Sequence, residues 1–447
     1  MLLFLTYYAV MSFLKFSHAL ILTLASTLPL TSHAALDKNE REIVKQVDKN
    51  IPQALKEIEQ AVNINSGSLN IEGVKKVGAL TSEQLKAIGF KVEWLDGSAF
   101  NRAGHVLATH ESNDPDAIKI LMIGHLDTVF AKNDNFTTYK QLDADTASGP
   151  GVADMKGGNT IIITALKSLQ ALNLLENVSI KVLLTGDEES SGRPLSLSKQ
   201  AIVDAAIWAD VALGYENGDN NIKTAMAARR GYTGWTLNVT ANAAHSSQIF
   251  SESVGYGAIY EASRILNDFR EQLATQPNLT FNPGLIVGGT NADYDSANSS
   301  ATAFGKSNVI AQTVHVAGDL RALSPKQFEN AKRSMQLIAS NSLNGSKAEL
   351  IFEDGYPPMA LTDGNKKLLE LYSDASNDLG FNKVVAANPR NAGAADISFA
   401  ANHVDMALDG LGLMGSGAHT KNETADLTSL DKNIKKTALL IYRLGKL

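Results

Sequence analysis

The segment "ILMIGHLDTVF", residues 120–130, has the pattern that decides the fold. Residues 120–124 form an apolar run of the kind found in strands that are buried on both faces of a parallel sheet. His125 and Asp127 follow at the point where this strand should end. In open α/β sheets, binding sites gather beyond the carboxyl ends of the strands. The segment therefore predicts a central strand that brings an imidazole and a carboxylate to a functional site.

The sequence on both sides of this segment alternates between helix-like and strand-like stretches. Helices are expected at 41–64, 74–90 and 157–172, and strands at 91–95, 104–110, 118–124 and 178–186. Alternation of this kind indicates an α/β fold with a mostly parallel sheet. It occupies residues 35–224 and resumes over residues 355–447, which contain an expected helix at 364–380.

Residues 225–354 show a different pattern, in which strand–helix–strand occurs twice. The expected strands are 232–241, 279–289, 309–321 and 347–353, and the expected helices are 254–273 and 324–341. This βαββαβ order is that of a ferredoxin-like domain. Because the α/β pattern continues after it, the sequence predicts that this domain is inserted into the larger one.

The composition limits the classes of function that fit. The chain has 447 residues, 44% hydrophobic and 19% charged, which fits a soluble globular protein of about two domains. The net charge of −7 and the lack of a basic stripe argue against a nucleic-acid partner. There is no cysteine, so a metal site would have to use His, Asp and Glu.

Residues 1–34 have the composition of a secretory signal peptide. They contain one charge, Lys15, then the apolar stretch "ALILTLASTLPL", with Ser32 and Ala34 at the −3 and −1 positions of a cleavage site. We therefore expect a periplasmic or secreted protein with no membrane partner after the signal is removed. An uncleaved membrane anchor is the alternative, and Met11 is a second candidate for the start of the chain.

Four more segments place carboxylates or an imidazole after apolar stretches. Asp154 lies in the glycine-rich turn "SGPGVADMKGG" (148–158), and the buried strand in "LLTGDEESSG" (183–192) ends in Asp187, Glu188 and Glu189. Glu216 follows the strand-like "VALGY", and His419 lies in the glycine-rich "GLGLMGSGAHTKNE" (410–423). Each segment alone also fits an ordinary turn, an acidic helix start or a core histidine. Five such positions in one α/β domain favour a common site.

These residues suffice to hold two metal ions. His125, Asp154, Glu189, Glu216 and His419 would give each metal one His and one Glu, with Asp154 as the shared ligand. Nitrogen and oxygen ligands without thiolate suit Zn²⁺, with Co²⁺ or Mn²⁺ as alternatives. Glu188 would then move a proton as general base, and Asp127 would orient His125.

The motifs "GHLDTV", "GPGVADMKGG", "GDEESSG", "GYE" and "GAHTKNE" resemble the dizinc exopeptidase family that includes bacterial glutamate carboxypeptidase, aminoacylase and succinyl-diaminopimelate desuccinylase. The resemblance covers nearly all of the chain after residue 34 and implies the same ligand and base roles. It further implies a lid and dimerisation function for the inserted domain, and a homodimer through it. It also implies substrate roles for other residues, which are His245 at the carbonyl, Asn308 and Arg321 at a free carboxylate, and Arg390 and Gly393 in a substrate loop.

Two details depart from the family pattern: Ala311 stands where proline is usual, and no glycine follows His245. The expected activity is that of a metallocarboxypeptidase of the glutamate carboxypeptidase type, which hydrolyses the amide next to a C-terminal amino acid in a small peptide or N-acyl amino acid. An aminopeptidase or dipeptidase, an N-acyl amino acid deacylase, and a non-catalytic binding protein on the same fold are the alternatives.

Overall fold

The computed structural model describes residues 36–295 and 298–447. The expected signal peptide, residues 1–34, lies outside the described residues. No helix within the described ranges combines the length and the hydropathy that a membrane-spanning helix needs.

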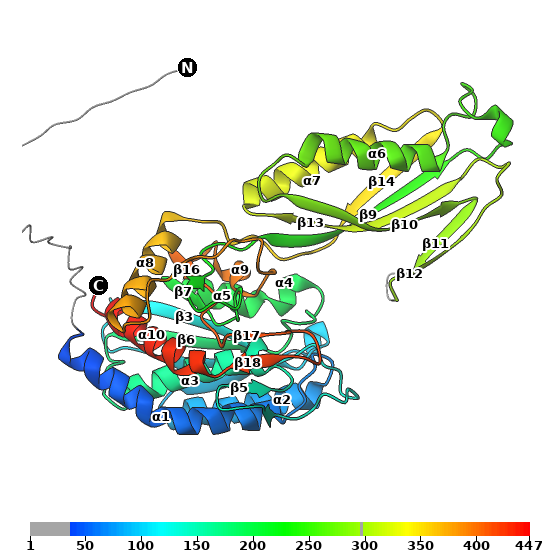
Figure 1. Cartoon of the computed structure of the whole chain (residues 1–447). Helices are drawn as coiled ribbons and strands as arrows, with labels where there is room; N and C mark the ends of the chain where they lie inside the picture. Colours follow the sequence, from blue (N-terminus) through cyan, green and yellow to red (C-terminus); the bar gives the residue numbers. More distant parts are fainter. Residues whose placement is uncertain (1–35, 296–297) are drawn as a thin grey trace, which may run out of the picture. The chain divides into compact units, whose positions relative to one another are not determined.

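A six-stranded sheet forms the centre of the larger α/β part (Figure 1). Its order is β1 (Lys91–Asp96), β2 (Gly104–His110), β6 (Val178–Thr185), β3 (Ile118–His125), β7 (Val211–Gly214) and β16 (Met406–Leu408). β3 runs parallel to β6 and β7, and β16 runs parallel to β7. β2 is antiparallel to both of its neighbours. The sheet, expected to be mostly parallel, is therefore mixed, with β2 reversed.

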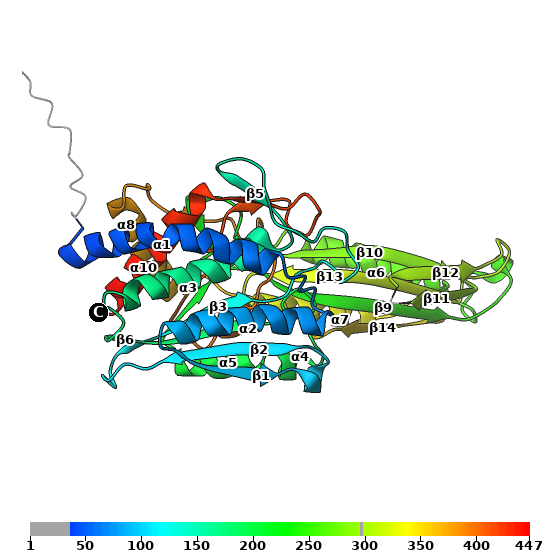
Figure 2. The same ribbon diagram turned by 90° about the horizontal axis from the view of Figure 1, so that it is seen from below.

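Helices cover both faces of this sheet, as the apolar run in β3 requires. Ile120 and Met122 pack into one core with helices from one face, whereas Leu121 and Ile123 pack into a separate core on the other. The helices of the first core are α1 (Lys38–Val62), α2 (Ile71–Ala87), α3 (Gly157–Gln170), α8 (Asp363–Asp378) and α10 (Thr428–Leu444). Those of the second core are α5 (Gln200–Trp208) and α9 (Ile397–Ala400). Figure 2 shows α1, α2 and α3 side by side.

A second sheet lies within residues 231–352 and has its own core. Its order is β10 (Thr280–Gly289), β13 (Thr313–Ala322), β9 (Gly231–Ala241) and β14 (Ser346–Phe352), with every pair antiparallel. Helices α6 (Ala258–Leu273) and α7 (Pro325–Ser340) cover one face of it (Figure 1). Trp235, Phe269 and Met335 are buried between the sheet and the helices. The βαββαβ order of elements agrees with the sequence pattern.

Some boundaries in this segment differ from the expected ones. α6 begins at Ala258 instead of residue 254, because Gly255 and Gly257 have φ values of 84° and 79°, which a helix does not allow. β13 begins at Thr313 instead of residue 309. The hairpin formed by β11 (Asn291–Asp295) and β12 (Ser300–Phe304) was not expected, since its sequence has no sustained apolar alternation.

The remaining elements are short. A small four-stranded sheet has the order β17 (Gly415–Ser416), β18 (Thr424–Asp426), β5 (Thr146–Ser148) and β4 (Lys140–Gln141). β8 (Thr224–Ala225) pairs with β15 (Val385–Ala386), and α4 (Leu195–Ser198) precedes α5. The small sheet matters for the site, because it joins the chain before Asp154 to the chain after His419.

Candidate functional site

Three neighbouring strands of the main sheet end at one edge, and each end carries polar residues. His125 is the last residue of β3 and is in register with Thr185, the last residue of β6. Glu188 lies three residues after Thr185, and Glu216 lies two residues after Gly214, the last residue of β7. Because the three strands are parallel, these chain segments emerge side by side.

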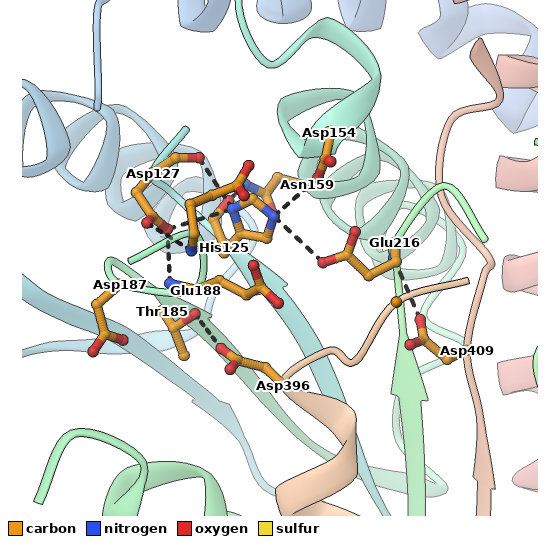
Figure 3. A network of polar contacts seen from close by, with 12 residues as sticks. His125, Asp127, Asp154, Asn159, Thr185, Asp187, Glu188, Glu216, Asp396 and Asp409 are labelled. Atoms are coloured by element: carbon orange, nitrogen blue, oxygen red, sulfur yellow. Dashed lines mark hydrogen bonds and ion pairs between the residues drawn. The ribbon is translucent and has the colours of Figure 1, made fainter. Parts of the chain in front are cut away.

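Two clusters of possible metal ligands meet at Asp154. The Nε2 atom of His125 lies 3.2 Å from Oδ1 of Asp154 and 3.3 Å from Oε1 of Glu216 (Figure 3). The Nε2 atom of His419 lies 3.1 Å from Oδ2 of Asp154 and 3.2 Å from Oε2 of Glu189. Within each cluster the ligand atoms lie within 4.8 Å of one another. Asp154 thus presents one oxygen to each histidine, as expected for a bridging carboxylate.

Asp127 is completely buried, and its contacts hold three residues of the site in position. One of its oxygens lies 3.4 Å from Nδ1 of His125 and also accepts a hydrogen bond from the backbone N–H of Glu188. The other oxygen accepts hydrogen bonds from the Ser68 hydroxyl and the backbone N–H of Glu189. The His125 ring is held by Asp127 through its backbone oxygen, which lies 3.0 Å from Nδ1, as well as by the carboxylate, which also binds the backbone of both glutamates.

The turn that carries Asp154 is held by a buried carboxylate, Glu423, which is 1% exposed. Its oxygens accept hydrogen bonds of 2.9, 3.0 and 3.1 Å from the backbone N–H groups of Gly151, Ala153 and Asp154. Gly151 has a φ of 73°, a conformation that glycine adopts without strain. Glu423 lies four residues after His419 and directly before β18. β18 pairs with β5, and β5 directly precedes the turn that carries Asp154. The small sheet thus brings His419 next to Asp154.

The site concentrates negative charge in a buried place. Burial first, and then the charge of Asp154, raise the pKa of Glu216 to about 7. Hydrogen bonds to Asp154 and Glu189 raise the pKa of His419 to about 11. Burial would lower the pKa of His125, but the charge of Glu216 and the hydrogen bonds to Asp127 and Asp154 raise it well above its usual value. Two imidazoles among this many carboxylates form a donor set that fits a pair of divalent cations.

Glu188 belongs to neither ligand cluster. It lines a cavity of about 220 Å³ together with Asp154, Glu216 and His419. Its side chain extends toward His125 and Glu216 in Figure 3. Burial and the charge of Glu216 raise the pKa of the Glu188 carboxyl well above its usual value. A carboxyl of this kind, close to the ligands but not among them, is suited to accept and return a proton.

The third acid of the run, Asp187, has a structural role instead. It is completely buried, and Lys199 Nζ lies 3.0 Å from its Oδ1. Lys199 also lies 3.0 Å from Oδ1 of Asp396, whose other oxygen accepts a hydrogen bond from Thr185. The Tyr356 hydroxyl contacts both Asp396 and the backbone oxygen of Glu188. This network holds the loop that carries Glu188 and Glu189 through contacts separate from those of Asp127.

The sequence model of peptidase family M20/M25/M40 matches residues 121–443, which include all the residues of both ligand clusters. The chain belongs to this peptidase family. The resemblance inferred from the motifs is thereby confirmed. Carboxypeptidase G2 of Pseudomonas sp. strain RS-16 is 26% identical over 435 residues, covering 95% of this chain and 97% of that protein.

Solved structures of other peptidases share the fold. An aminopeptidase from Bacillus cereus superposes with a TM-score of 0.70 at 18% identity, covering 88% of this chain and 99% of its own. A Bacillus subtilis protein described as a dinuclear metal-binding peptidase superposes with a TM-score of 0.61 at 15% identity, covering 89% and 99%. At these identities the likeness establishes the mixed α/β fold and not the substrate.

Not all of the residues expected at the site of this family member lie together. Gly393 lines the cavity next to Glu188, and Arg390 lies just before it in the same loop. His245 and Asn308 lie beside each other, since Ser246 N–H donates to the Asn308 backbone oxygen. His245 is exposed, and neither residue lines the cavity. Arg321 also lies outside the cavity lining and pairs with Asp319 at 2.9 Å.

Two further arginines were missed by sequence reasoning. Arg229 lines the cavity, pairs with buried Asp409 at 2.6 Å and donates to the backbone oxygen of Gly393. Its neighbour Arg230 is 9% exposed, and within the described part of the chain its Nε has no hydrogen-bond partner. Its Nη1 donates to the Thr280 hydroxyl at 2.9 Å, and burial together with the charges of Arg321 and Arg390 lowers the pKa of Arg230. The only signal in the sequence was the pair "RR" before a strand.

Proposed function

We propose that this chain is a dinuclear-metal exopeptidase that releases a C-terminal amino acid with a free carboxylate from a small peptide or an N-acyl amino acid. The observation that carries the proposal is the Asp154 carboxylate, which presents one oxygen to His125 and the other to His419. The similarity to carboxypeptidase G2 over 95% of the chain supports the glutamate carboxypeptidase type. The nitrogen and oxygen donors favour Zn²⁺, with Co²⁺ or Mn²⁺ as alternatives.

In the proposed mechanism, His125, Asp154 and Glu216 would hold one cation, and Asp154, Glu189 and His419 the second. Such a pair of cations polarises a carbonyl and makes water more acidic. Glu188 accepts the proton of the attacking water and returns it to the nitrogen that leaves as the C–N bond breaks. Asp127 keeps Nε2 of His125 directed at the ligand cluster by holding the Nδ1 side of the ring.

The arginines beside the cavity support recognition of a carboxylate. The charges of Arg321 and Arg390 lower the pKa of Arg230, and the charge of Asp319 partly offsets this effect. Arg230 donates from Nη1 to Thr280 but keeps its Nε without a partner in the described residues, and an anion bound there would stabilise the buried cation. The free carboxylate of a substrate would meet this requirement with charge-assisted hydrogen bonds.

The proposal is tested with three substrates that share one amide bond. These are an N-acetyl dipeptide with a free C-terminal glutamate, the same compound as its C-terminal amide, and the dipeptide with a free α-amine. We expect the N-acetyl acid to be cleaved and the amide to lose about tenfold to a hundredfold in kcat/KM, since each charge-assisted hydrogen bond contributes about 1.5–3 kcal/mol. A requirement for the free amine would favour an aminopeptidase or dipeptidase instead.

Substitution of the arginines sharpens this test. Arg321→Gln should raise KM for the acid but change little for the amide, because the amide lacks the C-terminal α-carboxylate, whereas the side-chain carboxylate is common to both substrates. Arg270→Gln, at an exposed position on α6, is the matched control and should change neither. An equal effect of Arg321→Gln on both substrates would contradict a carboxylate role.

We also propose that the protein is a homodimer in which His245 of one copy serves the site of the other. The support is that His245 and Asn308 are neighbours in the β9–β13 segment and lie apart from the cavity of their own chain. Mixing inactive His245→Ala and Glu188→Ala proteins should restore about a quarter of the activity, since half of the randomly exchanged dimers would contain one intact site. No recovery after demonstrated subunit exchange would contradict the proposal.

We propose export to the periplasm or the medium on the basis of the composition of residues 1–34. The N-terminal sequence of the mature protein, recovered from the periplasmic fraction, should begin at Ala35. Full-length protein that remains in the membrane fraction would instead indicate the uncleaved anchor.

A further inference from the structure

A second cavity, of about 270 Å³, lies beside Glu189. The first cavity is lined by Glu188, and the second by Glu189 and Ser190. The other walls of this second cavity, called here the Leu69 groove, are residues 67–70 and residues 128, 129, 131 and 132. A substrate whose amide lies over Asp154 and Glu188 therefore has a cavity beside each of the two adjacent glutamates.

The walls of the Leu69 groove are fixed by backbone contacts. Ser68 N–H donates to the Thr128 backbone oxygen, and Thr128 N–H donates to that of Ser66. Gly67 is packed so closely that a Cβ atom there would lie 2.3 Å from the Phe130 backbone oxygen. The Ser68 hydroxyl also binds Asp127, the residue that orients His125. The groove is thus preformed and is built into the same hydrogen-bonded unit as the ligand cluster.

The chemistry of the groove is apolar with a few polar groups. Leu69 is 74% exposed and Val129 is 39% exposed, so two aliphatic side chains face solvent next to a strongly charged centre. Thr128 is 1% exposed, and its hydroxyl is without a hydrogen-bond partner in the described residues. Lys132 is the one cationic residue among the lining residues. Exposed aliphatic side chains on preformed walls are typical of a pocket that binds an apolar group.

We propose that the Leu69 groove binds the acyl side of the substrate and selects an apolar side chain on the residue whose carbonyl is attacked. The inference rests on the proposed function, because it assigns the C-terminal carboxylate to the arginine side of the first cavity. The residue on the acyl side of the attacked amide then binds in the Leu69 groove, beside Glu189. Leu69 and Val129 become buried only when that residue is bound, which gives the enzyme its preference.

The test uses N-acetyl-Xaa-Glu substrates in which Xaa is Gly, Ala, Leu, Phe or Asp. We expect kcat/KM to be about tenfold to a hundredfold higher for Leu than for Gly, as follows from burying one leucine side chain. Val129→Asp should reduce this Leu-to-Gly ratio to about one. Because the ratio compares kcat/KM for the Leu and Gly substrates in the same variant, a general loss of activity affects both values equally and does not change the ratio.

A second variant and a control keep the result interpretable. Leu69→Asp, at a position that is 74% exposed, should fold and should reduce the same ratio. Ile207→Asp on α5, where the side chain is 64% exposed and away from both cavities, should leave the ratio unchanged.

The possible failures are distinguishable. If the wild-type enzyme cleaves the whole panel with one rate, prefers Asp, or keeps its Leu-to-Gly ratio in both variants, the groove assignment is wrong while the proposed function stands. If no N-acetyl-Xaa-Glu is cleaved but the corresponding amides or free dipeptides are, the proposed function fails, and the groove assignment fails with it.

Discussion

Replacing Glu423 by glutamine should weaken the turn that carries Asp154 without changing its shape. Glu423 is 1% exposed and accepts three backbone hydrogen bonds, one through Oε2 from Gly151 and two through Oε1 from Ala153 and Asp154. In Glu423→Gln one of these atoms becomes an NH₂ group, which cannot accept. The best orientation keeps the two bonds at Oε1 and loses the bond from Gly151.

The magnitude follows from these three bonds. A hydrogen bond to a charged group contributes about 1.5–3 kcal/mol and one between neutral groups about 0.5–1.5 kcal/mol. Losing one charged bond and converting two others to neutral bonds costs about 3.5–6 kcal/mol. Burial raises the pKa of Glu423 to about 7, so the ionised carboxylate carries a cost of about 3 kcal/mol that glutamine avoids. The expected net loss is therefore up to about 3 kcal/mol, measured at pH 8, where the wild-type carboxylate is ionised.

The assay is urea unfolding at pH 8 of the metal-saturated protein, followed by circular dichroism. Asp363→Asn, at a side chain that is 97% exposed in a surface ion pair, is the control and should cost less than about 0.5 kcal/mol. A gain in stability for Glu423→Gln would refute the reasoning, because it would mean that the three contacts do not outweigh the cost of burying the charge.

Three further outcomes follow from the site. Glu188→Gln should lower kcat by about a hundredfold to ten-thousandfold while the bound metal per chain stays constant; a loss below tenfold would exclude the general-base role. The metal-free protein should lose stability as pH rises from about 4.5 to about 7. Burial raises the pKa of Glu216 and Glu423 in the folded protein to about 7. These carboxyls therefore bind protons more tightly in the folded state than in the unfolded state, and deprotonation favours unfolding. His419 adds to this loss above pH 6.5, since its folded pKa is about 11. Thermal melts with and without Zn²⁺ should therefore diverge with rising pH, and parallel curves would contradict a cation site. Lys199→Met should destabilise the protein by about 3–5 kcal/mol in urea unfolding, because it leaves Asp187 and Asp396 buried without their cation.

The ligand residues could be predicted from the sequence because each one lies in a recognisable local sequence pattern. His125 and Glu216 follow apolar strands, and parallel strands bring their ends to one edge whatever the order of the strands. Asp154 was recognisable from the glycines around it. Glu188 and Glu189 followed a buried strand, although only the structure separates their positions from that of Asp187, which pairs with Lys199.

The features that sequence reasoning missed depend on contacts between distant parts of the chain. Glu423 binds backbone groups about 270 residues earlier, and no local periodicity encodes that contact. The reversed direction of β2 depends on its pairing with β1 and β6, and a strand pattern alone carries no direction. The unpaired Nε of Arg230 is visible only once the folded neighbours are in place.

The central claim is that Asp154 joins two cations held by residues from four separate segments. Anomalous diffraction at the zinc edge, from crystals grown with Zn²⁺, tests it most directly. We predict two peaks about 3.5–4 Å apart, one in contact with His125 and Glu216, the other with Glu189 and His419, and Asp154 between them. A single peak, or none at these residues, would contradict the account.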